Sequence, residues 1–425
     1  MPSLPPPEAR LSADPGTITA EVRAARRAVF IAFIASGFSF ASWVSRIPDV
    51  RDQLRASPST LGLVLLAVAA GSLIAMPLAG IVVTKIGAAR SVAIMSLILS
   101  VGLVVVAVGY WYGIPPIVAG LFLIGFGNGT WDVAMNVEGA AVEQRLGRAI
   151  MPKFHAGFSV GTVAGALGGV AMVALSVPVT AHLIGVAVVV AVLVPLSVRS
   201  FLPMPLRQAQ STEGQASSVP AHGTNPHPLR AWTEPRTLLI GVFVLCMAFT
   251  EGTGNDWLAV AVIDGYQAAP VLGPLALAVF LTAMTAGRWF GPGLIDRYGR
   301  VVVLRVSALI ALVGLLLVVF GTLLPIAFLG SVLLGLGTAL GFPVGMSAAA
   351  DDPAMAAARV SVVASIGYTA FLAGPPLIGF LGDQFGVLRA LTVTAVLLGF
   401  AALIAGITRP LAGHDQIRSA RPPES

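Results

Sequence analysis

The most constraining feature of this chain is a series of apolar runs, each about 20 residues long, that recur from residue 28 to residue 408. A helix of that length crosses roughly 30 Å of hydrocarbon. The sequence is 56% hydrophobic and 10% charged, with a mean hydropathy of +0.90, whereas soluble domains carry about 25% charge. We therefore predict an all-α membrane protein whose twelve transmembrane helices span approximately 28–47, 60–83, 91–110, 116–137, 154–175, 178–198, 237–262, 271–292, 301–321, 325–347, 360–381 and 388–408.

The only long polar stretch between these runs is 199–236, and its Ser, Gly, Pro and Gln content is typical of a flexible linker. With the termini inside, 20 of the 25 Lys and Arg residues lie on the inner side and four on the outer side, which favours this orientation. We expect a multi-pass protein of the plasma membrane, the inner membrane of a bacterial cell, with both termini cytoplasmic. The expected parts are an N-terminal tail (1–27), a first six-helix bundle (28–198), a cytoplasmic linker (199–236), a second six-helix bundle (237–408) and a C-terminal tail (409–425).

Three short patterns return at nearly one spacing, which indicates that the second bundle repeats the first. The pattern at 123–127, LIGFG, returns as LLGLG at 333–337, and Gly157-Phe158 returns as Gly367-Tyr368, both 210 residues later. Lys85-Ile-Gly returns as Arg297-Tyr-Gly after 212 residues. Two like halves related by an axis along the membrane normal are what alternating access requires, so we expect the substrate to bind between them.

The charge and motif content excludes several classes of function. The net charge of +6 does not indicate a nucleic-acid partner, because the basic residues are dispersed between apolar runs. Cys246 is the only cysteine, so no intramolecular disulfide forms. We find no nucleotide-binding glycine loop, no metal-ligand spacing and no hydrolase order of Ser, His and Asp. We expect no cofactor, no metal and no enzymatic activity, and a monomer whose partners are the lipid bilayer, a small solute and a proton.

The loop after the eighth run carries GLIDRYGR at 293–300, in which Asp296, Arg297, Gly299 and Arg300 resemble the signature of the major facilitator superfamily between helices 2 and 3. The first-half copy, GIVVTKIGAAR, keeps Gly80, Lys85 and Gly87 but has Thr84 in place of the acid. The resemblance implies the two-bundle fold. It also implies that these loops form a cytoplasmic gate, with a weaker copy in the first half.

Three longer segments resemble the MosC-like branch of that superfamily: FASWVSRIPDVRDQL at 40–54, the segment 127–166 that begins GNGTWDVAMN, and EGTGNDW at 251–257. Together these matches cover most of the chain, and they imply membership of the branch. Fold-level resemblance does not identify a substrate.

Glu251 is the strongest candidate for proton coupling. It lies about 22 Å into the seventh run, near the membrane midplane, where an ionisable group is expensive and usually functional. A carboxylate at that depth suits a site that takes up and releases a proton. The alternative is a protonated acid that is hydrogen-bonded to the backbone.

Asn128, Asp132 and Asn136 recur every four residues in the fourth run and therefore share one helix face. Such a polar stripe is not expected to face lipid. Asp132 and its neighbours bind substrate or the coupling proton, or else form a hydrogen-bonded contact between helices; the sequence leaves both open.

Trp43 and Arg46 lie at the outer end of the first run, and Asn255, Asp256 and Trp257 occupy a comparable place at the end of the seventh run. An aromatic residue beside a cation either lines a sugar or anion site or anchors the helix at the interface. From position alone, we expect an extracellular gate between Arg46 and Asp256.

Two further residues lie close to expected helix ends. His155 opens the fifth run and is either a titrating group or a hydrogen-bonded cap. Arg288 is expected in the last turn of the eighth run, where it would join Asp296 in the cytoplasmic charge network. Gly157, Gly161 and Gly165 form a smooth ridge for close packing, and Pro343 is expected to kink the tenth run.

These features predict a secondary active transporter of a small organic solute, coupled to protons through Glu251 with Asp132 as a second acid. The polar residues slightly favour a sugar-like or polyol solute. Proton-driven efflux of amphipathic drugs or metabolites is the alternative within transport. A non-transporting membrane sensor or a membrane enzyme is the alternative from another class.

Overall fold

A computed structural model describes residues 20–147, 150–202, 228–352 and 355–411. Almost all of them are helical, and twelve segments of this described part are long and apolar enough to cross a membrane. The first half contains α1 (Ala20–Val44), α2 (Ile47–Leu54), α3 (Pro58–Ile86), α4 (Ala88–Gly109), α5 (Ile114–Leu146), α6 (Met151–Ala174), α7 (Val179–Ser197) and η1 (Val198–Ser200). The second half contains η2 (Pro228–Thr233), α9 (Pro235–Tyr266), α10 (Leu272–Tyr298), α11 (Arg300–Phe320), α12 (Leu324–Thr338), α13 (Gly341–Ala349), α14 (Ala356–Phe385), α15 (Val387–Ala390), α16 (Thr392–Ile404) and η3 (Ala405–Thr408).

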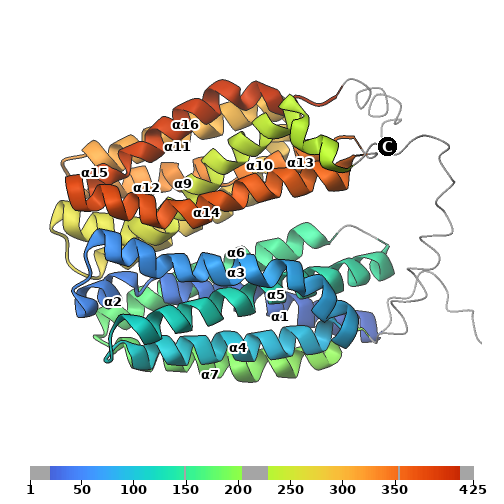
Figure 1. Cartoon of the computed structure of the whole chain (residues 1–425), viewed down its shortest axis with the longest axis horizontal. Helices are drawn as coiled ribbons and strands as arrows, with labels where there is room; N and C mark the ends of the chain where they lie inside the picture. The colour runs from blue at the N-terminus through green and yellow to red at the C-terminus, as the bar shows by residue number, and fades with distance from the viewer. Residues whose placement is uncertain (1–19, 148–149, 203–227, 353–354, 412–425) are drawn as a thin grey trace, which may run out of the picture.

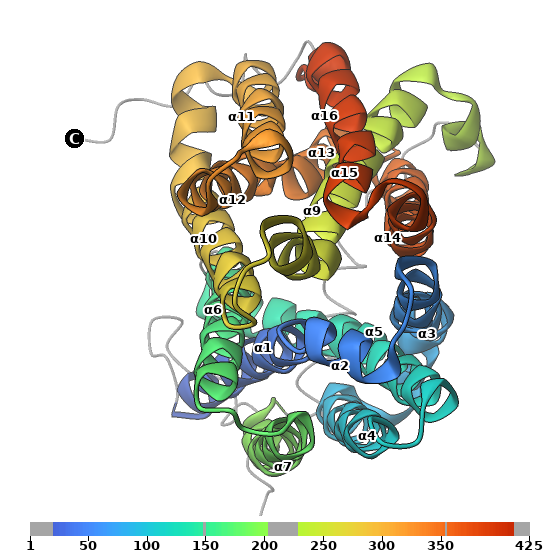
Figure 2. The ribbon, with the colours of Figure 1, turned by 90° about the vertical axis from the view of Figure 1, so that its left-hand side faces the viewer.

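The two halves form separate bundles that lie side by side (Figure 1). The main contacts between them pair α3 with α14 and α6 with α10, on opposite sides of the molecule (Figure 2). We call the end that carries α2 and α15 the α2 end, and the end that carries η1 and η2 the linker end. Most of the expected linker, residues 203–227, lies outside the described residues, as do most of both tails.

The repeat in the sequence corresponds to a repeat in helix packing. Gly120 of α5 and Gly102 of α4 approach each other closely, and Gly330 of α12 meets Gly314 of α11 in the same way. A Cβ atom on Gly335 would lie 2.2 Å from the Phe280 carbonyl oxygen, so only glycine allows this crossing. Small residues let membrane helices approach backbone to backbone, since no hydrophobic effect drives their association.

The same principle explains the glycine ridge of α6, which packs on α1. Cβ atoms on Gly161 and Gly165 would lie 2.1 and 2.4 Å from the carbonyl oxygens of Ile34 and Phe38. Gly299 has a different role: its φ of +81° ends α10 and starts α11, a conformation that favours glycine. Gly87, its counterpart in the repeat, has a φ of +82° at the α3–α4 junction.

Several helix boundaries differ from the expected spans. The first helix begins at Ala20, because its basic first turns extend the helix beyond the apolar run, and it breaks at residues 45–46 before the short α2. The tenth span is divided into α12 and α13, with Pro343 in the first turn of α13, and this break confirms the expected kink.

Candidate functional site

The centre of the site is an ion pair between Glu251 and Arg288. Glu251 lies midway along α9, and its Oε1 accepts a hydrogen bond of 2.8 Å from Nη2 of Arg288 on α10. The two side chains are 16% and 28% exposed, respectively, so the pair is largely shielded but remains accessible. Arg288 also donates through Nε to the Ala339 carbonyl at 3.3 Å. That carbonyl lies at the break between α12 and α13, so Arg288 joins three parts of the second half.

The expected place of Arg288 in the last turn of its helix is therefore wrong. The helix does not stop before Pro292 but continues to Tyr298, which leaves Arg288 ten residues from the end. Proline is tolerated inside membrane helices because neighbouring groups satisfy the backbone that it frees. At that depth, the partner of Arg288 is Glu251 rather than the charges of the 293–300 loop.

The polar stripe of α5 lies in the first half. The Asn136 side-chain amide donates to the Asp132 backbone carbonyl at 2.8 Å and to its Oδ1 at 3.3 Å. Asn128 accepts a hydrogen bond of 2.9 Å from Ser36 of α1. Asn128 therefore supports a helix–helix contact, whereas the Asp132 carboxylate has only an amide as its hydrogen-bond partner among the described residues.

Two ring-bearing side chains, Tyr368 and His155, lie within electrostatic range of these charged groups. Tyr368 of α14 is within electrostatic range of Asp132, although the two residues belong to different halves. The Tyr368 ring lies 6.2 Å from Phe342 and 6.2 Å from Phe371, measured between centroids. On the side of α6, His155 packs edge-on against Phe33 at 5.1 Å and is within electrostatic range of Arg288.

At the α2 end, the expected gate between Arg46 and Asp256 does not form. Arg46 is only 2% exposed, donates to the Val177 carbonyl at 2.9 Å and lies 3.5 Å from Asp49, all within the first half. Its position in the break between α1 and α2 turns the side chain into the bundle. The ion pair that crosses between the halves here joins Arg51 of α2 with Asp264 of α9.

The other residues that were expected near this gate lie in α1 of the first half and in α9 of the second half. Trp43 and Trp257 are buried, at 3% and 1% exposure, which favours packing over solute contact. Asn255, 8% exposed, has a side-chain oxygen without a hydrogen-bond partner among the described residues. Asp256 is partly buried, and among the described residues its carboxylate makes no ion pair.

At the linker end, the expected gate residues differ in what they contact. Arg300 donates to Asp351 at 2.9 and 3.0 Å and to the Thr408 carbonyl at 3.3 Å. Arg236 also pairs with Asp351 at 2.9 Å. Arg297 lies over the Tyr298 ring, and Lys85 is exposed. The described contacts of Arg300 thus join elements of the second half.

Sequence reasoning missed Asp351. The sequence feature that could have pointed to it is the acid pair Asp351-Asp352 in the loop after the tenth run. Arg236 and Arg300 approach Asp351 only in the folded chain. A second ion-pair group beside it joins Arg359 to Glu234 at 2.6 Å and to Asp352 at 2.8 Å.

We expect this second group to make stability depend on pH. The Arg359 guanidinium lowers the pKa of Glu234 below its ordinary value of 4.5. A lowered folded-state pKa contributes stability above pH 4.5, and this contribution is lost as the pH falls through the folded-state pKa. Glu234→Gln should therefore lower the melting temperature at pH 7, through a loss of about 1 kcal/mol or less, and should make progressively less difference as the pH falls below 4.5. Thermal unfolding between pH 7 and pH 3 measures the change in melting temperature, with Glu21→Gln at an exposed acid as the control. A change in melting temperature that does not depend on pH would contradict the prediction.

Within the described residues, no group of three or more His, Cys, Asp or Glu residues is arranged to hold a metal ion. The polar groups of the site are thus carboxylates, one guanidinium, amides, a phenol and an imidazole. Such a set can bind a polar solute by hydrogen bonds and can exchange a proton.

Comparisons with known proteins extend this description. The family model of the Major Facilitator Superfamily matches residues 28–358. The uncharacterized transporter y4wD of Sinorhizobium fredii is 31% identical over 380 residues, which cover 89% of this chain and 96% of that protein. Membrane protein MosC of Rhizobium meliloti is 27% identical over 368 residues, covering 86% of this chain and 85% of MosC.

Solved structures resemble the fold. The nucleoside transporter NupG has a TM-score of 0.69 and 15% sequence identity, and the match covers 92% of this chain and 98% of NupG. A bacterial homolog of the human lysosomal transporter Spinster, in an inward-facing and unoccupied conformation, has a TM-score of 0.69 and 13% identity, covering 96% of this chain and all of that chain. At these identities the likeness concerns the fold alone.

Proposed function

Because the chain belongs to the major facilitator superfamily and is a multi-pass membrane transporter, we propose that it is a secondary active transporter that carries a small organic solute by alternating access and is driven by protons. In this proposal the bundles 28–198 and 237–408 rock against each other. The linker end is cytoplasmic, in a plasma membrane, since 20 of the 25 Lys and Arg residues lie on that side of the expected spans. The molecule acts as a monomer.

The ion pair between Glu251 and Arg288 carries this proposal. A proton on Glu251 competes with Arg288 for the same carboxylate, because a neutral acid attracts the guanidinium less than a carboxylate does. Protonation would therefore weaken the hold of α9 on Arg288 and leave the Ala339 carbonyl as its other hydrogen-bond partner. A solute that binds Arg288 would favour the same released state, which couples solute and proton without direct contact between them.

Asp132 is the second acid of the proposed mechanism. It belongs to the first half and is within electrostatic range of Tyr368 in the second half. Its amide partner, Asn136, stabilises the carboxylate without neutralising it. A proton or a solute hydroxyl at Asp132 would thus act on the contact between halves.

The amides and acids of the site favour a hydroxyl-rich solute such as a sugar or polyol, because each hydroxyl can donate and accept a hydrogen bond. The cluster of Phe342, Tyr368 and Phe371 favours the second candidate, efflux of an amphipathic compound whose apolar part would lie against these rings.

Thermal stabilisation of the purified protein by a panel of sugars, polyols and lipophilic cations tests the substrate class. A ligand that binds only the folded state raises the melting temperature. Stabilisation by a polyol that is lost in Asp132→Asn supports uptake of a polar solute. Stabilisation by lipophilic cations alone favours efflux, and no flux of any stabilising compound across liposomes would favour a sensor.

Proton coupling is tested with Glu251→Gln in liposomes that carry an imposed pH gradient. The variant keeps a polar side chain that can bond to Arg288 but cannot release a proton. We expect exchange of the stabilising solute to persist while accumulation driven by the gradient is lost. Glu21→Gln is the matched control, because it makes the same exchange at an exposed acid in the first turn of α1. Normal accumulation by Glu251→Gln, with an unchanged pH profile, would exclude Glu251 as the coupling acid.

A further inference from the structure

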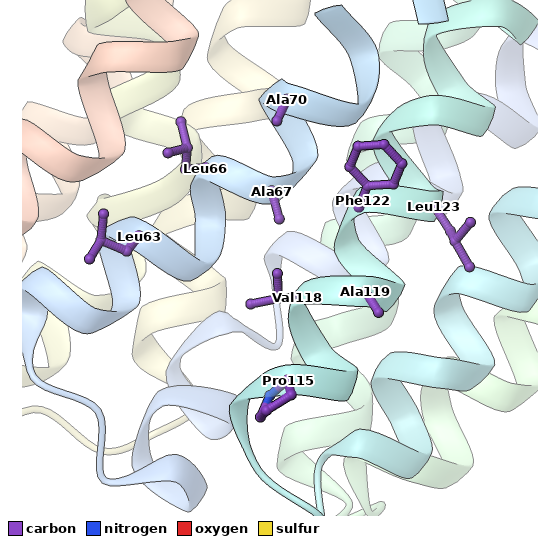
Figure 3. Close-up of a pocket in the computed structure, with 9 residues that line it drawn as sticks. All are labelled: Leu63, Leu66, Ala67, Ala70, Pro115, Val118, Ala119, Phe122 and Leu123. Carbon is purple, nitrogen blue, oxygen red and sulfur yellow. The ribbon is translucent and has the colours of Figure 1, made fainter. Parts of the chain in front are cut away.

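An apolar groove opens on the outer surface of the first half, between α3 and α5 near the α2 end. Its volume is about 620 Å³. Figure 3 shows the side chains that line it, from α3 on one side and α5 on the other. The lining is apolar throughout: Leu63, Leu66, Ala67 and Ala70 of α3, and Pro115, Val118, Ala119, Phe122 and Leu123 of α5.

The groove exists because the two helices cross closely and then separate. Cβ atoms on Gly71 and Gly125 would lie 2.2 Å from the Phe122 oxygen and 2.0 Å from the Val68 oxygen, so the crossing allows no side chain. Toward the α2 end, α3 and α5 diverge (Figure 3), and α3 lies beside α14 of the other half (Figure 2). There a Cβ atom on Gly62 would lie 2.4 Å from the Pro375 oxygen.

Depth along the helices identifies the medium in the groove. It begins at Pro115, just past the exposed Trp111 and Tyr112, which are residues typical of the membrane interface. From Pro115 to Leu123 the helix rises about 12 Å, which is close to the thickness of one hydrocarbon leaflet. Water has no polar partner along this lining, and a polar solute has none either.

We propose that a phospholipid of the leaflet at the α2 end binds this groove with one acyl chain, and that it stabilises the state in which the α2 end is closed. The flexible acyl chain fills the narrow groove between the helices. An empty groove would leave the lining side chains without van der Waals contacts. A second copy of the protein would present helices too wide for such a space.

The dependence on state follows from the geometry of α3. The groove is open because α3 is held against α14 through Gly62 and through Gly379, whose Cβ atom would lie 2.4 Å from the Pro58 oxygen. When the α2 end opens, this contact breaks and, in addition to the rocking of the bundles, the end of α3 bends toward α5 within its own bundle, which narrows the groove. A ligand shifts an equilibrium toward the state that binds it better. This second part rests on the proposed alternating access, whereas lipid binding does not.

Ala119→Phe tests the site, because Ala119 is exposed and its side chain lines the groove. Ala181→Phe is the matched control, since Ala181 is exposed near the same end of α7. With added phosphatidylethanolamine, native mass spectrometry should show a severalfold lower ratio of lipid-bound to lipid-free protein for Ala119→Phe than for wild type or Ala181→Phe. Equal lipid retention by the two phenylalanine variants overturns the site. A dimer that Ala119→Phe disrupts would assign the groove to a second copy and also overturn it.

The effect on conformation has its own measurement. Spin labels at Gln53 of α2 and Gln267 after α9, both exposed, report the separation of the halves at the α2 end, in a Cys246→Ser background. Phosphatidylethanolamine should shift wild type toward the shorter distance, and Ala119→Phe should no longer respond. If wild type binds the lipid without a change in distance, lipid binding stands and the dependence on state is wrong.

Discussion

Arg288→Ala is expected to abolish solute accumulation and to lower the melting temperature, whereas the double variant Glu251→Gln/Arg288→Ala should recover most of the lost stability. Removing the guanidinium leaves the Glu251 carboxylate, only 16% exposed, without its partner. Breaking a largely shielded pair in this way costs up to about 3 kcal/mol, which corresponds to about 6–12 °C for a bundle of this size. Neutralising the acid as well removes the unpaired charge. Thermal unfolding of the four proteins of this cycle separates the charge effect from the loss of packing.

Arg305→Ala is the control for this cycle. Arg305 also lies in a helix of the second half and donates to a backbone carbonyl, that of Ala402, at 3.1 Å. No carboxylate is paired with it among the described residues, so its removal should lower the melting temperature much less. If Arg288→Ala lowers the melting temperature no more than Arg305→Ala does, the pair does not contribute the stability assigned to it. The same conclusion follows if the double variant recovers none of the lost melting temperature.

The apolar runs were enough to predict the number and kind of membrane-spanning helices, because hydrocarbon tolerates few other ways to satisfy a backbone. Glu251 could also be found from the sequence, since an acid at mid-helix depth is rare and easily located by counting residues. Its partner could not. Arg288 is 37 residues away, and its contact depends on how far α10 continues beyond Pro292. A sequence pattern that ends a helix at proline gives the wrong depth and therefore the wrong partner.

The α2 end shows the same limit. Arg46 and Asp256 have plausible depths for a contact, but the break at residues 45–46 turns Arg46 toward Val177 in its own bundle. Arg51, five residues further along, makes the contact with Asp264 because α2 extends across the end of the bundle. Such a short change of direction depends on packing, and no periodicity in residues 40–54 predicts it.

Gly62→Ala is expected to shift the protein away from the state with a closed α2 end. The new Cβ atom would lie 2.4 Å from the Pro375 oxygen and 2.9 Å from its carbonyl carbon, both backbone atoms that cannot rotate away. Overpacking of this kind costs about 1–3 kcal/mol, and each 1.4 kcal/mol changes an equilibrium constant tenfold. The surface ion pair between Arg51 and Asp264 is too weak to resist this, since exposed pairs contribute about 1 kcal/mol or less.

The spin-label pair at Gln53 and Gln267 measures this shift as a larger population of long distances. Gly80→Ala is the matched control, because Gly80 lies in the same helix but has no atom within 4 Å of the added Cβ. Gly379→Ala should reproduce the effect of Gly62→Ala, since its Cβ atom meets the Pro58 oxygen from the opposite helix. Identical distance distributions for Gly62→Ala and Gly80→Ala would mean that closure does not depend on this backbone contact. The ion pair of α2 with α9 would then have to hold the α2 end, and Asp264→Asn should open it instead.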